Sequence, residues 1–119
     1  MNRFFRSLWH AFNGIILHIK TGKNFQLQGM VALLVIGLGI TVQLSTSEWL
    51  IVLLFIGGVL ALETFNSALE ALSDEVTREF QPGIRKAKDL AAAAVLLFSL
   101  SALVGGLLIF IPKIALYFD

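Results

Sequence analysis

The sequence predicts an all-α integral membrane protein, with an N-terminal amphipathic helix followed by three membrane-spanning helices. Of the 119 residues, 57% are hydrophobic and 14% are charged, against about 25% charged residues in soluble domains. The mean hydropathy is +0.85. Residues 24–47, 49–62 and 90–112 contain no charged side chain, and crossing the hydrocarbon takes about 20 mostly apolar residues. We therefore expect one membrane domain covering residues 1–119.

The first element is expected to be a surface helix over residues 1–23. Its apolar side chains recur at helical spacing and form one face: Phe4, Phe5, Leu8, Phe12, Ile15, Ile16 and Ile19. Arg3, Arg6 and His10 fall mostly elsewhere. A helix of this kind tends to lie in the membrane interface, and the alternative is that it packs on the protein itself. Both place it beside the charged segment later in the chain.

The three spans are expected at residues 25–44, 48–73 and 89–112. Residues 45–47 form the tight turn between the first two, with Ser47 as the N-cap of the second and Glu48 in its first turn. Residues 74–88 hold much of the charge and form the loop before the third span, with a turn at Gln81-Pro82-Gly83.

The orientation in the membrane follows from the basic residues. The N-terminal segment and the 74–88 loop each carry four Lys or Arg, whereas the 45–48 turn carries none. Cytoplasmic loops are rich in Lys and Arg, so the N-terminus and the 74–88 loop are predicted to be cytoplasmic and the C-terminus to lie outside. Lys113 is a mild exception.

Polar residues interrupt the second span on one face. Glu63, Asn66, Glu70 and Asp74 are three, four and four residues apart and fall within an arc of roughly 80° at about 100° per residue. An ionisable group facing lipid costs about 2.5 kcal/mol or more. These side chains are therefore expected to point into a helix bundle, a wet cavity or a ligand. The alternative is that they only join helices through polar contacts.

The depth of these side chains suggests different roles. Glu63 is the deeper and less solvated, which suits a general base. Glu70 lies nearer the cytoplasm and suits Mg²⁺, which takes one or two carboxylates with substrate phosphates and water. Lys88 could meet a phosphate as a point charge. Asp89 could contact a nucleotide, but capping the third span is the preferred interpretation.

Several function classes are excluded or disfavoured. The chain has no cysteine, which excludes disulfides and thiol catalysis. It lacks the P-loop motif G-x-x-x-x-G-K-[ST], the protein-kinase motif set and a G-x-S-x-G elbow. His10 and His18 are eight residues apart, with no acidic residue anywhere in residues 1–47, so no metal site is expected there.

The segment Glu63-Thr64-Phe65-Asn66-Ser67-Ala68-Leu69-Glu70, followed by Asp74 and by Lys88-Asp89 at the start of an Ala-rich helix, resembles the signature of the small bacterial diacylglycerol kinase and undecaprenol kinase family. The resemblance covers nearly the whole chain. It implies a homotrimeric lipid kinase of the inner (cytoplasmic) membrane, with active sites between protomers. Such an enzyme transfers the γ-phosphate of Mg-ATP to the hydroxyl of a membrane lipid alcohol.

The resemblance also assigns roles by position. Glu63 is similar to the family's general base, Asn66 to its polar partner, and Glu70 to the residue that holds Mg²⁺ and the phosphates. Further positions match residues around the nucleotide: Arg3, Asp74, Glu79, Gln81, Lys88 and Asp89. Phosphoryl transfer needs mainly positioning and charge neutralisation, which is consistent with so small a set. Between the two substrates, the surroundings of Trp49 and Pro112 favour undecaprenol over diacylglycerol.

Two positions depart from the family pattern. Gly22 stands where the family has a second metal-binding Glu, and Gln81 stands where it has His. The alternatives to an active kinase are a catalytically weak or inactive member of the family and a non-enzymatic small membrane oligomer. If the metal site limits the rate, the substitution Gly22→Glu is expected to raise turnover.

Overall fold

The computed structural model describes residues 2–119, which form four helices in the order α1, α2, α3 and α4. Their bounds are Arg3–Thr21, Lys23–Thr41, Thr46–Val76 and Pro82–Tyr117. The second, third and fourth are long and apolar enough to cross a membrane. The all-helical prediction with three long apolar helices is therefore confirmed, and the chain fits a multi-pass membrane protein.

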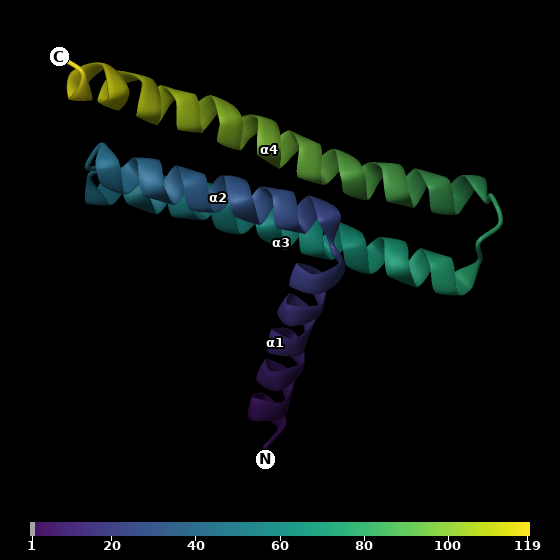
Figure 1. The fold of residues 1–119 in the computed structure, drawn as a ribbon. Helices are drawn as coiled ribbons and strands as arrows, with labels where there is room; N and C mark the ends of the chain where they lie inside the picture. Colours follow the sequence, from purple (N-terminus) through teal and green to yellow (C-terminus); the bar gives the residue numbers. More distant parts are fainter. Residues whose placement is uncertain (1) are drawn as a thin grey trace.

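The three long helices lie alongside one another, and α1 projects away from them (Figure 1). Both α2 and α4 pack on α3. A small buried core joins the ends of these helices at Val42, Leu44, Val52 and Phe110. Most other apolar side chains on the long helices are exposed in the single chain, as is expected of surfaces that face lipid or other helices.

The two longest helices interlock through aromatic rings that lie on glycines. The ring of Phe98 on α4 lies against Gly58 on α3, and the ring of Phe55 on α3 lies against Gly105 on α4. The two rings also meet edge to face, with centroids 6.3 Å apart. A glycine at each position lets the facing ring approach the helix backbone closely, which is how small residues tighten helix contacts in membranes.

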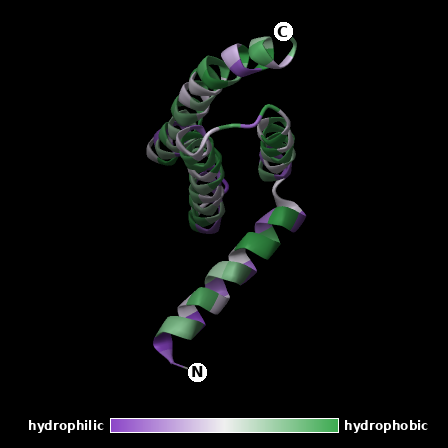
Figure 2. Ribbon diagram, turned by 90° about the vertical axis from the view of Figure 1, so that its left-hand side faces the viewer, coloured by the Kyte–Doolittle hydropathy of each residue, from purple (hydrophilic) through white to green (hydrophobic). Residues whose placement is uncertain are grey.

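The helix α1 begins at a side-chain cap and ends at Gly22. The side chain of Asn2 accepts a hydrogen bond from the backbone N–H of Phe5, and Gly22 has an extended backbone that separates α1 from α2. In Figure 2, α1 leads away from the three long helices, with hydrophobic and hydrophilic residues alternating along it. Its large apolar side chains, from Phe4 to Ile19, are exposed in the single chain.

The turn between α2 and α3 comes earlier than expected. The helix α2 ends at Thr41 rather than at residue 44, and Gln43 adopts a left-handed conformation with a φ of 59°. The N-cap of α3 is Ser45, not Ser47, because Ser45 and Glu48 form a reciprocal capping box. In this motif each side chain accepts a hydrogen bond from the other residue's backbone N–H.

The charged segment 74–88 is mostly helical, which differs from the loop expected there. The helix α3 continues to Val76 and α4 begins at Pro82, so only residues 77–81 connect them. Proline suits the first position of a helix because no intrahelical partner is needed for its missing N–H. Asp89 is not the cap of this helix: Gln81 occupies the N-cap position, and Asp89 lies two turns inside.

Candidate active site

The polar face of α3 divides into a buried part and an exposed part. Glu63 is 5% exposed and Asn66 is 8% exposed, although the single chain is otherwise open. Glu70 and Asp74, one and two turns further on, are exposed. Glu63 and Asn66 therefore lie in the protected part of the face, and Glu70 and Asp74 lie in its exposed part.

The buried pair has unused capacity to accept hydrogen bonds. The Oδ1 atom of Asn66 is buried without a hydrogen-bond partner. Among residues 2–119, no ion pair or side-chain hydrogen bond to Glu63 is found within the usual distances. A buried acceptor left unpaired costs about 1–3 kcal/mol. The Oδ1 atom of Asn66 can therefore take a donor from another molecule, such as a hydroxyl group, beside the carboxylate of Glu63.

An ion pair joins α3 to α4 at the exposed end of this face. Lys88 Nζ lies 3.3 Å from Asp74 Oδ1 across the 77–81 connector. Arg85 and Asp89, one turn apart on α4, form a second pair at 3.3 Å that is well exposed. The structure thus brings Lys88 and Asp74 together, whereas Asp89 turns to its own helix.

The remaining predicted residues lie further from the buried pair. Glu79 and Gln81 are exposed on the connector, where the side chain of Thr77 accepts a hydrogen bond from the backbone N–H of Glu79. Arg3 is the first residue of α1, about 22 Å along that helix from His18 at a rise of about 1.5 Å per residue, and α1 projects away from the long helices (Figure 1). Within one chain, Arg3 is therefore not brought to the polar face of α3.

The structure adds a residue that the sequence interpretation set aside. His18, near the end of α1, is 8% exposed and contacts α3 through both ring nitrogens. Nδ1 lies 3.1 Å from the Thr64 hydroxyl, and Nε2 lies 3.0 Å from the Ser67 hydroxyl. The ring also stacks on Phe25 with centroids 4.2 Å apart. Periodicity within one helix carries no signal for such a contact between helices.

The ring of His18 lies directly against Gly22, which has no side chain. A Cβ atom at residue 22 would lie 2.7 Å from His18 Nε2 and closer still to Cδ2, well inside ordinary van der Waals contact. The ring therefore occupies the space that a side chain at position 22 would need. An acidic residue there requires His18 to move.

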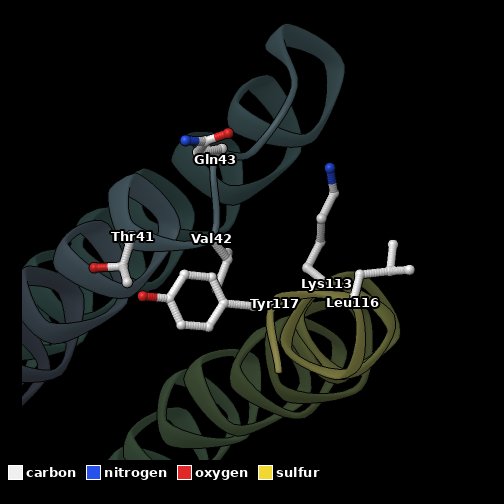
Figure 3. A pocket seen from close by; sticks show the side chains of 6 residues that line it. All are labelled: Thr41, Val42, Gln43, Lys113, Leu116 and Tyr117. Carbon is white, nitrogen blue, oxygen red and sulfur yellow. The ribbon is translucent and has the colours of Figure 1, made fainter. Parts of the chain in front are cut away.

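A pocket at the opposite end of the bundle is separate from this site. It lies between the α2–α3 turn and the end of α4, lined by Thr41, Val42, Gln43, Lys113, Leu116 and Tyr117 (Figure 3). Close to this end, Lys113 pairs with Glu48 at 3.1 Å. Since Glu63 follows Glu48 by fifteen residues on α3, about 22 Å at helical rise, this pocket contributes nothing to the polar face.

Comparison with known proteins identifies the family. The profile of the prokaryotic diacylglycerol kinases matches residues 9–110. The undecaprenol kinase of Bacillus subtilis (strain 168) is 43% identical over 114 residues, which cover 96% of this chain and 93% of that protein. The matched region includes the whole polar face, His18 and the 77–81 connector. On this evidence, the chain belongs to the prokaryotic diacylglycerol kinase family.

Proposed function

We propose that this protein is a lipid kinase that transfers the γ-phosphate of Mg-ATP to the hydroxyl group of undecaprenol, with diacylglycerol as the second candidate substrate. Membership of the family supports phosphoryl transfer to an alcohol. The extent of similarity to a protein named undecaprenol kinase favours undecaprenol. The structural observation that carries the proposal is the burial of Glu63 and Asn66 on one face of α3, with the Oδ1 atom of Asn66 unpaired.

In this proposal Glu63 is the general base. Its carboxylate accepts the proton of the lipid hydroxyl, while the hydroxyl oxygen forms a bond to the γ-phosphorus. The bond between that phosphorus and the oxygen that links the β- and γ-phosphates breaks, and ADP leaves with the electron pair. Asn66 lies one helical turn away and orients the lipid hydroxyl or the phosphate. Such positioning is most of what phosphoryl transfer asks of a protein.

The donor set fits a magnesium ion bound mainly through the nucleotide. Mg²⁺ prefers oxygen ligands and commonly uses one or two carboxylates with substrate phosphates and water. Glu70 offers an exposed carboxylate one turn beyond Asn66, and Asn66 offers an unpaired oxygen. Glu70 is therefore the residue proposed to hold the ion, which would neutralise charge on the phosphates.

The nucleotide is proposed to lie over the exposed end of α3 and the start of α4. Lys88 and Asp74 are already adjacent there, and Lys88 could exchange its carboxylate partner for a phosphate. Glu79, Gln81 and Asp89 surround the same end of the hairpin. Arg3 is proposed to reach the nucleotide from a neighbouring protomer of a homotrimer, because its own helix carries it away from the polar face.

The site is proposed to lie at the cytoplasmic surface of the inner membrane, with the N-terminus and the 77–81 connector inside and the C-terminus outside. Glu63 lies about 26 Å along α3 from Thr46 at a rise of about 1.5 Å per residue. The hydrocarbon is about 30 Å thick, so the carboxylate would sit just within its cytoplasmic boundary. There it can meet a lipid hydroxyl from one side and ATP from the other, with α1 lying in the interface.

The test is phosphate transfer from γ-labelled Mg-ATP by the purified full chain in lipid-containing micelles. Undecaprenol and diacylglycerol are offered separately, with buffer lacking lipid as the blank. The proposal expects a labelled lipid phosphate with undecaprenol and little label with diacylglycerol. Nucleotide binding without transfer to either lipid would instead support an inactive member of the family.

A further inference from the structure

The hydrogen bonds around His18 fix which of its ring nitrogens carries a hydrogen. The hydroxyl of Thr64 donates to the carbonyl of Leu60 at 2.8 Å. A hydroxyl has one hydrogen to donate, so Thr64 can only accept from His18, and the hydrogen must be on Nδ1. In the neutral ring, Nε2 is then left as an acceptor for the hydroxyl of Ser67.

The hydroxyl of Ser67 therefore has a different kind of hydrogen-bond partner from other hydroxyl groups on α3. Thr64 and Ser73 each donate to the carbonyl four residues earlier, as hydroxyls inside helices commonly do. The hydroxyl of Ser67 instead forms its hydrogen bond with the His18 ring on α1. Ser67 also lies one turn after Glu63 and one turn before Glu70, between the two carboxylates to which the proposed chemistry assigns the proton and the metal.

Contacts on one face, along one edge and at both nitrogens hold the ring in place. Phe25 stacks on its face, Gly22 meets its Cδ2–Nε2 edge, and the two hydroxyls on α3 hold its nitrogens. These are the hydrogen bonds between α1 and α3 within residues 2–119, and they join the end of α1 to the polar face.

We propose that His18 is a positioning residue of the kinase site: as the Nδ1–H tautomer it holds the Ser67 hydroxyl and the end of α1 in place between Glu63 and Glu70. This inference rests on the proposed function. It does not place His18 in contact with the lipid or the nucleotide. Its role is to keep Ser67 and the end of α1 in one position beside the site. A misplacement of about 1 Å in an active site can cost about 10²-fold in rate.

The tautomer is tested without any assay of activity. Full-length protein labelled with ¹⁵N-histidine in detergent micelles contains two histidines, and His10→Gln identifies the signals of His18. We expect a hydrogen-bearing Nδ1 and a hydrogen-free Nε2. Thr64→Val removes the acceptor for Nδ1 and should shift the hydrogen toward Nε2. A hydrogen on Nε2 in the unsubstituted protein, alone or on both nitrogens, would overturn the proposal.

The positioning role is tested by comparing two conservative substitutions. A glutamine amide reaches approximately as far as Nε2 and can still bind Ser67, whereas an asparagine amide reaches approximately as far as Nδ1 and can bind only Thr64. We expect His18→Ala and His18→Asn to lower kcat by about 10²-fold with little change in KM for Mg-ATP, and His18→Gln to recover most of that loss. His10→Gln, on the exposed part of α1, is the matched control.

The outcomes separate the two proposals. If the unsubstituted protein phosphorylates a lipid but His18→Ala keeps its kcat, the positioning role is wrong and the proposed function stands. Equal losses in the Gln and Asn variants, matched by equal losses of thermal stability, also overturn it, because they indicate a purely structural contact. If the unsubstituted protein phosphorylates no lipid, the proposed function fails and the positioning role of His18 fails with it.

Discussion

Adding a single methyl group at Gly22 should disturb the site through His18. In Gly22→Ala, the new Cβ would start 2.7 Å from Nε2 of the His18 ring. Ordinary contact begins at 3.4 Å, so either the ring or the backbone at residue 22 must retreat. The backbone there is tied by the hydrogen bonds that end α1 and begin α2, which makes the ring the part that moves.

The magnitude follows from what the ring would lose. Its two hydrogen bonds to α3 contribute about 1 kcal/mol each, and its stack on Phe25 contributes about 0.5–1.5 kcal/mol. Against this, replacing glycine by alanine stabilises by about 0.4–1 kcal/mol through the unfolded chain. We therefore expect Gly22→Ala to lower the free energy of unfolding by about 2 kcal/mol.

The assay is a double-mutant cycle on thermal stability in detergent, using His18→Ala as the second change. Once the ring is absent, its two contacts with a methyl group at residue 22 are gone and the close contact with the His18 carbonyl oxygen at 3.0 Å remains, so the cost of the methyl group should fall sharply. Activity should follow the same pattern, since both single variants displace the ring. If Gly22→Ala is neutral, or costs as much in the His18→Ala background, then the ring does not occupy the space at Gly22 and the reasoning is wrong.

Three further predictions test other parts of the account. Gly22→Glu alone should not raise turnover, contrary to the expectation from the family pattern, because the added side chain meets His18 first; a gain in turnover measured with labelled ATP would contradict this. Gly58→Ala should destabilise the α3–α4 contact by about 1–3 kcal/mol, because its methyl group would overlap the ring of Phe98. Gly57→Ala is the control, since a Cβ there meets open space. Equal melting temperatures of the two variants would refute the overlap. Ser45→Ala should cost about 1 kcal/mol through loss of the capping box, whereas Ser47→Ala should cost little; the reverse order in thermal unfolding would restore Ser47 as the cap.

The sequence was sufficient for the coarse fold because hydropathy and length report directly on membrane-spanning helices. The bounds were less well predicted, since a helix need not end where its apolar residues end. The helix α3 continues through Asp74 to Val76, and α4 starts at Pro82, before its apolar stretch begins. The capping box was readable in advance: Glu48 follows Ser45 by three residues, which is the spacing that the motif requires.

For the site, helical periodicity placed Glu63, Asn66, Glu70 and Asp74 on one face, and the structure divides that face by burial. What periodicity could not give is the contact between α1 and α3. His18 was read as an isolated histidine because its partners, Thr64 and Ser67, are 46 and 49 residues away. The same contact places the His18 ring where a side chain at residue 22 would lie, which the family pattern alone did not indicate.

The most direct test of the central claim is the activity of Glu63→Gln. Glutamine preserves the size of the side chain but cannot accept the lipid proton as a base, and loss of a general base typically costs about 10²–10⁴-fold. The control is Glu75→Gln, the same substitution at an exposed position on the same helix. With undecaprenol and γ-labelled Mg-ATP, we predict a fall in kcat of at least about 10²-fold for Glu63→Gln and an unchanged kcat for Glu75→Gln. Full activity of Glu63→Gln would contradict its assignment as the base.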